Sequence, residues 1–271
     1  MTFIIQFIAS TAFLIVILLI ARQFEKRTPL DSKQSTVEVI MDWKLAGVKL
    51  GMNQLLSPLT AASGVMIVNA MGGGWIHLRS DGLWFLFSLV VIILAIDLSA
   101  YLVHRAEHKF PVLWAMHSLH HSAESLTVVT GARHFWLEEV ITRSFFPVLG
   151  IIFKVPPEVA TTVAVLHLLL GDGLAHLNMP VSLGRFALCI QNPQYHRIHH
   201  SVEPQHQNKN FCKLLPLFDV IFGTAWKPGE DEFPKTGLES REKPSSIVDG
   251  IIWPIRHRLG RNTVSLAPGI Y

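Results

Sequence analysis

Residues 83–121 read LWFLFSLVVIILAIDLSAYLVHRAEHKFPVLWAMHSLHH, an apolar run followed by a dense histidine pattern. The run Leu83–Val103 contains Asp97 as its only charged residue and is long enough to span the hydrocarbon core of a bilayer. The histidines that follow are His104, His108, His117, His120 and His121. This combination predicts a transmembrane helix that carries a metal site at the membrane surface.

A second His-x-x-His-His motif follows much later in the chain, at His196, His199 and His200. Residues three and four apart share one face of a helix, so we expect each motif to present its imidazoles to one point. Neutral imidazole suits Fe, Zn, Cu and Ni. Because a zinc site takes at most four ligands, eight histidines exceed one zinc site and indicate two metal ions. Nitrogen ligands and open positions favour iron and dioxygen.

Composition supports a membrane protein. The chain has 271 residues, of which 50% are hydrophobic and 16% charged, against roughly 25% charged in an ordinary soluble domain. A net charge of +3 without a basic, aromatic stripe argues against nucleic-acid binding. Cys189 and Cys212 are too few for an iron–sulfur cluster, and no flavin or nucleotide motif is present. Electrons for redox chemistry would therefore come from a separate protein.

Further apolar segments predict a multi-pass fold. Phe3–Ile20 is expected to be an anchor, and Trp43–Ala70 a second span with a proline kink. The pair Pro156–Pro157 predicts a hairpin of two helices, Glu138–Phe153 and Glu158–His176. Such a hairpin crosses the membrane twice and returns the last histidines to the side of the first. We therefore expect an all-α integral membrane protein with three transmembrane helices, a helical hairpin and a cytosolic helical cap that holds the metal site.

Three strings also carry a family resemblance. Asp97–His108, Trp114–Ser122 and Pro193–Ser201 resemble the three histidine boxes of the fatty acid hydroxylase/sterol desaturase superfamily. Leu217–Thr224 is similar to the closing signature of that superfamily. The resemblance extends from about residue 83 to 226. It implies N-terminal anchor helices at 1–82, a catalytic domain at 83–226 and a polar C-terminal tail at 227–271.

The resemblance implies a membrane-bound, non-haem di-iron oxidoreductase that uses O2 as co-substrate to hydroxylate or desaturate a lipid. The iron ligands that it implies are His104, His108, His117, His120, His121, His196, His199 and His200. His176 matches a further histidine of the family. Where members often carry Arg-x-His-Pro, this chain has Arg133-His134-Phe135-Trp136, so both a metal-binding and a supporting role stay open for His134. A ferredoxin-like or cytochrome-b5-like electron donor would dock on the cytosolic face.

Three carboxylates are candidates for orienting the ligand histidines: Asp97, Glu138 and Asp219. Asp97 precedes His104 by two helical turns and shares its face, and carboxylates often hold the outer nitrogen of a ligand histidine.

Two other functions are open on the sequence. His104-Arg-Ala-Glu107-His108 fits the His-x-x-Glu-His pattern of a membrane zinc metalloprotease, with Glu107 as the base. A metal-binding transporter is the other alternative. The sequence does not distinguish acyl, sterol, carotenoid and ether lipids, or hydroxylation from desaturation.

Overall fold

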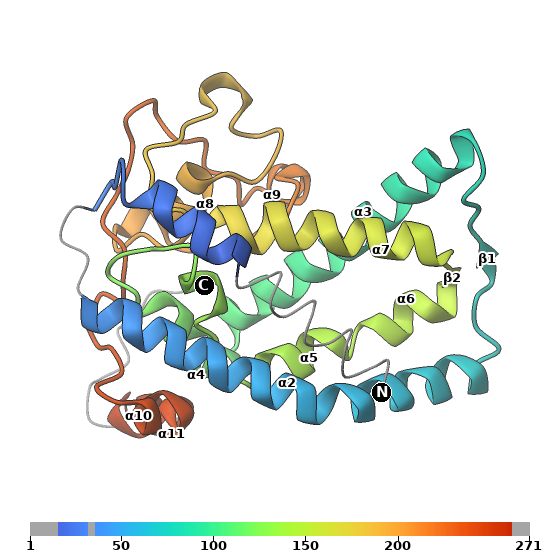
Figure 1. Ribbon diagram of the computed structural model, residues 1–271, viewed down its shortest axis with the longest axis horizontal. Helices are drawn as coiled ribbons and strands as arrows, with labels where there is room; N and C mark the ends of the chain where they lie inside the picture. Colours follow the sequence, from blue (N-terminus) through green and yellow to red (C-terminus); the bar gives the residue numbers. More distant parts are fainter. Residues whose placement is uncertain (1–15, 32–35, 262–271) are drawn as a thin grey trace.

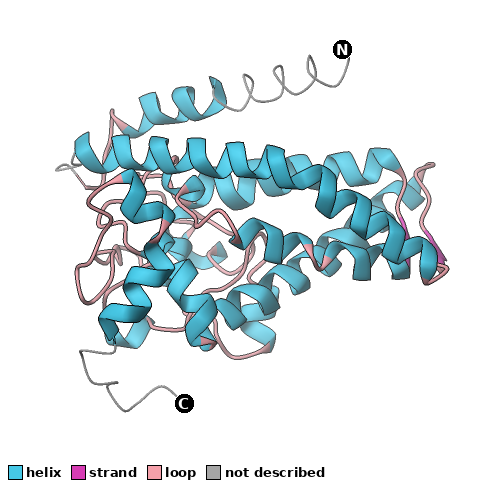
Figure 2. Cartoon of the chain, turned by 90° about the horizontal axis from the view of Figure 1, so that it is seen from below, coloured by secondary structure: helices cyan, strands magenta, loops and turns pink. Residues whose placement is uncertain are grey.

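The computed structural model describes residues 16–31 and 36–261, and most of them are helical. The long helices lie side by side along the long axis, and most of the short helices and loops gather at one end (Figure 1). A parallel pair of two-residue strands closes the opposite end (Figure 2). The α-helices are α2 (Thr36–Ala70), α3 (Leu83–Lys109), α4 (Pro111–His121), α5 (Glu138–Arg143), α6 (Phe146–Ile152), α7 (Pro157–Leu166), α8 (Pro193–His199), α9 (Leu217–Ile221), α10 (Ile247–Ile251) and α11 (Trp253–Arg261). The strands are β1 (Ile76–His77) and β2 (Phe153–Lys154); a π-helix, η2, covers His167–Gly173, and 3-10 turns cover Thr130–Ala132, Gly184–Phe186 and Pro204–His206.

Helix α3 is the one helix of residues 16–31 and 36–261 that is long and apolar enough to cross a membrane. Only 28% of its most apolar stretch is buried, whereas the central helix of a soluble protein would be mostly covered. Its N-terminal half exposes large apolar side chains, including Leu83 and Phe87. This helix matches the predicted span at 83–103.

The other predicted spans have different outcomes. Helix α2 starts seven residues before the predicted Trp43, and Pro58 lies inside it without ending it. Helix α2 is less apolar than α3, because polar residues such as Asn53 and Gln54 interrupt its uncharged C-terminal part. The predicted anchor Phe3–Ile20 lies mostly outside the described residues; residues 16–25 are helical.

The predicted hairpin is present, but its helices are interrupted. Its first arm divides into α5 and α6, and Phe153 pairs with Ile76 in the parallel ladder, which a purely helical prediction misses. Gly74, at φ +79°, donates its N–H to the carbonyls at the end of α6, and a Cβ atom there would meet the Lys154 side chain at 3.2 Å. The second arm continues from α7 into the π-helix, a rare local geometry that is frequent at functional sites.

The corner between α3 and α4 brings the first two histidine boxes together. Phe110 is extended, with φ −95° and ψ 123°, and Pro111 starts the next helix. A residue before proline is held out of the helical region, and proline is well suited to the first helical position. The chain therefore leaves α3 and re-enters a helix within one residue.

Residues after 226 pack against this corner. Met41, Leu45, Leu119, Leu238 and Trp253 form a buried apolar cluster that joins α2, α4 and the C-terminal segment. The indole N–H of Trp253 also donates to Ser118 Oγ at 2.9 Å. The segment predicted as a polar tail thus supports the helix that carries the second histidine box.

Candidate metal centre

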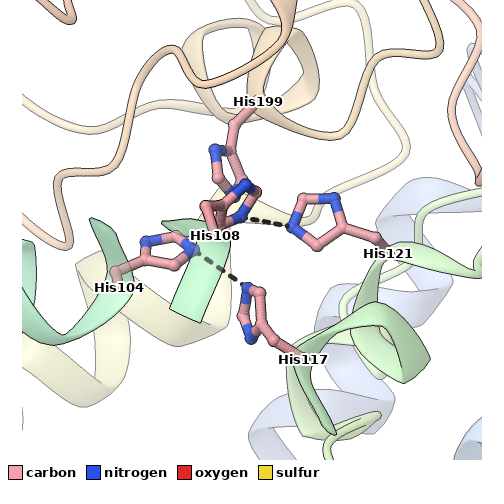
Figure 3. A group of neighbouring side chains, drawn as sticks. All are labelled: His104, His108, His117, His121 and His199. Atoms are coloured by element: carbon pink, nitrogen blue, oxygen red, sulfur yellow. Dashed lines mark hydrogen bonds between the residues drawn. The ribbon is translucent and has the colours of Figure 1, made fainter. Parts of the chain in front are cut away.

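Nine buried or half-buried histidines from separate parts of the chain form two neighbouring clusters. The first cluster contains His104, His108, His117, His121 and His199 (Figure 3). The second cluster contains His120, His176, His196 and His200. Within each cluster, one nitrogen of every imidazole lies within 4.8 Å of those of the others. All eight box histidines and His176 are therefore brought together.

Each His-x-x-His-His motif divides between the two clusters, which corrects the expectation that one motif presents its rings to one point. In α4, His117 and His121 belong to the first cluster and His120 to the second. At α8 the division is reversed, because His196 and His200 belong to the second cluster and His199 to the first. Residues four apart share a helix face, whereas the remaining histidine of each motif points elsewhere. The two consecutive histidines at the end of each motif therefore belong to different clusters.

In the first cluster, the outer nitrogens of three histidines are held by acceptors. His104 Nδ1 donates to the Phe211 carbonyl at 2.8 Å, and His199 Nδ1 donates to the Lys209 carbonyl at 2.8 Å. His117 Nδ1 is 2.9 Å from Glu138 Oε2. A proton on Nδ1 leaves Nε2 with a lone pair, which is how a metal-binding histidine is normally oriented.

Because the outer Nδ1 atoms are held in this way, the Nε2 lone pairs of His104 and His117 point at one another. His104 Nε2 and His117 Nε2 are 3.0 Å apart, although both rings use their Nδ1 proton elsewhere (Figure 3). Two acceptors at this distance need a cation between or beside them, either a proton or a metal ion. The buried Nε2 of His199 has no hydrogen-bond partner. These are the features expected of imidazoles arranged around an ion.

The second cluster is linked nitrogen to nitrogen. His176 Nε2 lies 3.1 Å from His120 Nε2 and 2.9 Å from His196 Nε2, and His196 Nε2 lies 3.2 Å from His200 Nε2. The Gln191 side-chain amide is 3.0 Å from His196 Nδ1. The outer Nδ1 atoms of His120 and His200 are buried without a partner.

The donor set fits metal ions. With metal–nitrogen bonds of about 2.1 Å, two ligands at right angles are about 3.0 Å apart, which is close to the separations in both clusters. Nitrogen donors in this number suit iron, copper, nickel and zinc. Buried polar atoms without partners are rare in proteins, and an ion in the first cluster would satisfy the inward Nε2 of His199.

Burial keeps most of these imidazoles neutral. It lowers the pKa values of His120, His121, His196 and His200 well below the usual value, and neighbouring histidines add to the effect. Burial lowers the pKa of His199 to about 3. His117 differs, because the carboxylates of Glu107 and Glu138 outweigh its burial and raise its pKa. Neutral imidazole is the metal-binding form, so at neutral pH the clusters are ready to bind cations.

The Glu138 carboxylate contacts His117 of the first cluster and His134, which stacks on His120 of the second cluster. Its Oε2 atom lies 2.9 Å from His117 Nδ1 and 3.0 Å from His134 Nδ1, and His134 stacks on His120 with ring centroids 4.1 Å apart. Burial opposes ionisation of Glu138, but His134 and His117 outweigh it and hold its pKa below the usual range. His134, His117 and Glu138 also form a third group that could hold an ion. The contacts of Glu138 therefore agree with the role predicted for it.

The other two predicted carboxylates act elsewhere. Asp97 accepts from the Leu215 N–H at 2.8 Å, and its second oxygen is 3.1 Å from His167 Nε2. The described contacts of Asp97 are therefore with His167 and Leu215, not with a box histidine. Asp97 and His104 are on the same helix, as predicted, but their side chains have different partners. His104 contacts His117 of α4, whereas Asp97 contacts His167 and Leu215.

Asp219 acts through the backbone. Its oxygens accept from the backbone N–H groups of Phe211 and Cys212 at 2.8 Å, and from the hydroxyls of Tyr195 and Thr224. The segment that it holds includes the Phe211 carbonyl, which binds His104. Asp219 thus positions a ligand indirectly, without touching a histidine.

A cavity of about 190 Å³ opens beside the clusters. Its walls combine histidines of both clusters with apolar side chains such as Val103, Phe146 and Phe211. Lys49 and Glu139 lie on its α2 and α5 side, 3.5 Å apart. The cavity can place a mainly apolar molecule against the metal-binding nitrogens.

Several site groups were not predicted. Gln191 and the carbonyls of Lys209 and Phe211 contact ligand histidines, and His167 pairs with Asp97. A backbone carbonyl has no residue-type signal, and Gln191 stands only five residues before His196, outside any box pattern. Only the position of His167 in an apolar segment could have marked it as unusual.

Fold and site together define a class of protein, in which a membrane-length helix leads into two buried histidine clusters beside a partly apolar cavity. The family model described as fatty acid hydroxylase matches residues 89–224, half of the chain. The chain belongs to this family, as the three histidine boxes predicted.

Curated relatives are lipid-modifying enzymes. The chain is 31% identical to alkylglycerol monooxygenase of Danio rerio over 131 residues, which are 48% of this chain and 29% of that protein. It is 26% identical to alkylglycerol monooxygenase of Xenopus tropicalis over 202 residues, 69% of this chain and 44% of that one. Ornithine lipid hydroxylase OlsE of Rhizobium tropici is 24% identical over 155 residues, 57% of this chain and 46% of the relative. The chain thus spans less than half the length of these relatives. No solved structure matches it.

Proposed function

We propose that this protein is a multi-pass membrane oxidoreductase that hydroxylates a lipid with O2, using two iron ions held by the two histidine clusters. The observation that carries the proposal is the arrangement of five and four mostly neutral imidazoles with inward-facing nitrogens beside a partly apolar cavity. Residues 83–226 would form the catalytic domain, and the metal centre would face the cytosol. The names of the relatives support a lipid as the substrate and hydroxylation over desaturation.

Bound iron would supply the activation of O2 and the removal of hydrogen from an unactivated C–H bond. The residues of the chain then have three tasks. The Phe211 and Lys209 carbonyls and the Glu138 carboxylate hold His104, His199 and His117 in the orientation that binds an ion. Apolar walls exclude water from the reacting carbon, and the cavity positions that carbon against the clusters.

The overall reaction needs an external reductant. One C–H bond becomes C–OH, one oxygen atom of O2 enters the product and the other leaves as water, and two electrons and two protons are consumed. Cys189 and Cys212 cannot hold an electron-transfer cluster. We therefore propose that a reduced ferredoxin-like or cytochrome-b5-like protein docks on the cytosolic face and delivers the electrons.

The alternatives are less well supported. A zinc metalloprotease would need His104 and His108 around one zinc ion with Glu107 as base, yet both histidines belong to a group of five. Transport sites commonly lie near the bilayer midplane, whereas His104 and His108 lie near the C-terminal end of α3. Neither alternative uses the second cluster.

The test compares lipids and metals from the same preparations. We would express the full chain, His120→Ala and His77→Ala in one host, the last being a control because His77 is exposed on β1. The wild type and the control should contain about two iron ions per chain and produce a lipid that is heavier by one oxygen atom. The His120→Ala variant should lose both the product and part of the iron. Zinc at one ion per chain, or the oxygenated lipid persisting in His120→Ala, would contradict the proposal.

A further inference from the structure

The N-terminal segment 22–31 contacts the parts of the chain that carry the second histidine cluster, although it precedes the family match at 89–224. Residues 16–25 form the dark-blue helix at the end of the molecule where most of the short helices gather (Figure 1). The contacts are made largely by two acidic residues, Glu25 and Asp31. Glu25 is completely buried, and the Asp31 side chain is 28% exposed. Because a buried carboxylate is costly without partners, the hydrogen bonds of Glu25 matter for this region.

Glu25 fixes the loop that follows His176. Its Oε1 atom accepts from the backbone N–H groups of Val128 at 2.6 Å and of Asn178 at 3.0 Å. Its Oε2 atom accepts from the Arg22 guanidinium at 2.8 Å. Since Asn178 follows His176 by only two residues, the bond to its N–H restricts the backbone that carries the His176 ring.

The same loop is bound to the end of the N-terminal segment. The Asn178 side chain accepts from the Asp31 N–H at 2.9 Å and donates to the Asp31 carbonyl at 3.3 Å, and the Asn178 carbonyl accepts from the Leu30 N–H at 3.2 Å. Asn178 is itself completely buried. His176 Nε2 lies within 3.1 Å of the Nε2 atoms of two other ligands, so the position of this loop affects three rings.

Asp31 also holds the helix of the third histidine box. One terminal nitrogen of the Arg197 guanidinium donates to both Asp31 carboxylate oxygens, at 2.8 and 3.0 Å, and Arg197 Nε donates to the Pro234 carbonyl at 2.7 Å. Arg197 is buried and directly follows His196 in α8. The ion pair with Asp31 therefore restricts α8 next to a ligand of the second cluster.

The bond from Glu25 to Val128 leads to a third part of the cluster. The 3-10 turn after Val128 ends at Arg133, whose Nε donates to the Leu119 carbonyl at 3.2 Å. Leu119 directly precedes His120 in α4. Glu25 is thus connected to the end of α4 as well as to the loop after His176.

The second cluster needs support of this kind because two of its rings lack outer acceptors. The Nδ1 atoms of His120 and His200 are buried without a partner, whereas three rings of the first cluster have theirs held. Rings without such contacts are oriented by the backbone that carries them and by the ion.

We infer that residues 22–31 position the second cluster for its metal ion, with Glu25 and Asp31 as positioning residues. Together these two residues tie the segments that carry three of its four histidines. The inference rests on the proposed function and adds to the metal centre a segment outside the family match. The carboxylates bind backbone and arginine groups, so their effect on the ion passes through the position of the rings.

Cobalt(II) binding tests the inference at each cluster separately. In a His104→Ala background an ion should bind only at the second cluster, and in a His196→Ala background only at the first. We would purify the full chain in each background, titrate Co²⁺ against a competing chelator and record the visible absorption of the histidine-bound ion. Adding Glu25→Gln should weaken Co²⁺ binding at the second cluster about 10- to 100-fold and alter its spectrum. The affinity and spectrum of the first cluster should not change.

Asp31→Ala tests the second contact at a half-buried position, where the fold is at less risk. It should also weaken Co²⁺ binding selectively at the second cluster, because the Arg197 guanidinium loses both carboxylate oxygens. Asp31→Glu should restore most of the affinity, since a longer carboxylate at a partly exposed site can still reach Arg197.

Asp249→Asn is the matched control for Glu25→Gln. Asp249 is a buried carboxylate that accepts from the Ser245 N–H and from Arg256, but it belongs to α10. This change should lower the melting temperature and leave Co²⁺ binding at both clusters unaltered.

The outcomes separate the inference from the proposed function. Equal losses at both clusters, or an unchanged second cluster in both Glu25→Gln and Asp31→Ala, would overturn the inference while the proposed function stands. Absence of Co²⁺ binding in both background variants would overturn the metal centre of the proposed function, and the inference with it.

Discussion

The two histidine clusters are built from the same residue type but are supported differently. In the first cluster, His104, His117 and His199 each have an outer nitrogen held by a carbonyl or a carboxylate. In the second cluster, the outer nitrogens of His120 and His200 are buried without partners. A held Nδ1 proton defines the tautomer and the ring orientation before any ion binds. Three rings of the first cluster are therefore preorganised by two backbone carbonyls and the Glu138 carboxylate, whereas His120 and His200 of the second cluster depend more on the ion itself.

This difference predicts unequal metal affinities. Loss of an outer contact typically weakens metal binding about 10- to 100-fold. Because His120 and His200 have no partner for their outer nitrogens, we expect the second cluster to bind its ion more weakly by about that ratio. Titration of the loaded protein with a chelator should show two classes of ion, with the second cluster emptied first. A single class of ion would mean that the outer contacts do not set the affinity.

The largest effect is expected from removing one ligand from each cluster separately. His104→Ala should empty the first cluster and leave about one ion per chain, and His196→Ala should do the same for the second. Either change should abolish lipid oxidation, because both ions are needed. Metal analysis and lipid mass spectrometry on the same membranes check this. If one variant loses both ions, the clusters are not independent.

Glu138→Gln should have the next largest effect. The amide cannot accept protons from both His117 and His134 with the strength of a carboxylate, so metal affinity should fall about 10- to 100-fold. The first cluster should be weakened more than the second, because His117 is its ligand. Chelator titration measures both. Glu139→Gln is the control, since Glu139 follows directly but pairs with Lys49 and Arg143 at the surface of the helix. Equal losses of metal affinity in both variants would show that the contacts of Glu138 do not determine the affinity.

Asp219→Asn tests the indirect support of the first cluster. The carboxylate accepts from the backbone N–H groups of Phe211 and Cys212, and an amide NH2 would oppose at least one of them. We expect a cost of about 1–3 kcal/mol in unfolding free energy and weaker metal binding at the first cluster, because the Phe211 carbonyl shifts. Thermal unfolding and chelator titration check the two effects. The exposed Asp231→Asn should change neither, and a lower stability without altered metal binding would limit Asp219 to the fold.

The sequence predicted the ligands better than their grouping. Histidine spacing identified the eight box histidines, because helical periodicity places residues three and four apart on one face, and the family resemblance added His176. It could not show that His120 and His121 serve different clusters, since that depends on how α4 meets α8 across the chain. The partner of Asp97, His167, depends in the same way on how α3 meets the π-helix. Helical periodicity shows which side chains share a face, but the residues that they contact are decided by tertiary packing.

The fold was predicted in its main helices and missed at their interruptions. Leu83–Val103 stands out because its apolar run has a length and composition that tertiary contacts do not change. The π-helix at His167–Gly173 and the two-residue ladder depend on contacts with Asp97 and with β1, which lie far away in sequence. The packing of Trp253 onto α4 was unpredictable for another reason, because a short apolar patch in a polar region has no period to identify its partner.

The smallest effect is expected from Trp253→Phe, which tests whether this C-terminal packing belongs to the fold or to the metal centre. The change removes the hydrogen bond from the indole to Ser118 Oγ but keeps the apolar contact with Leu45 and Leu119. Ser118 still donates to the Ala115 carbonyl, so its hydroxyl proton keeps a partner. The unfolding free energy should fall by about 1 kcal/mol, which lowers the melting temperature by roughly 2–4 °C. Metal content should stay at the wild-type level, because the lost hydrogen bond joins Ser118 to Trp253 and involves no histidine, and Trp84→Phe, at a half-exposed site on α3, should leave both quantities unchanged. A loss of ions from the first cluster in Trp253→Phe would show instead that the C-terminal segment sets the position of α4, and that both clusters depend on packing beyond their own outer contacts.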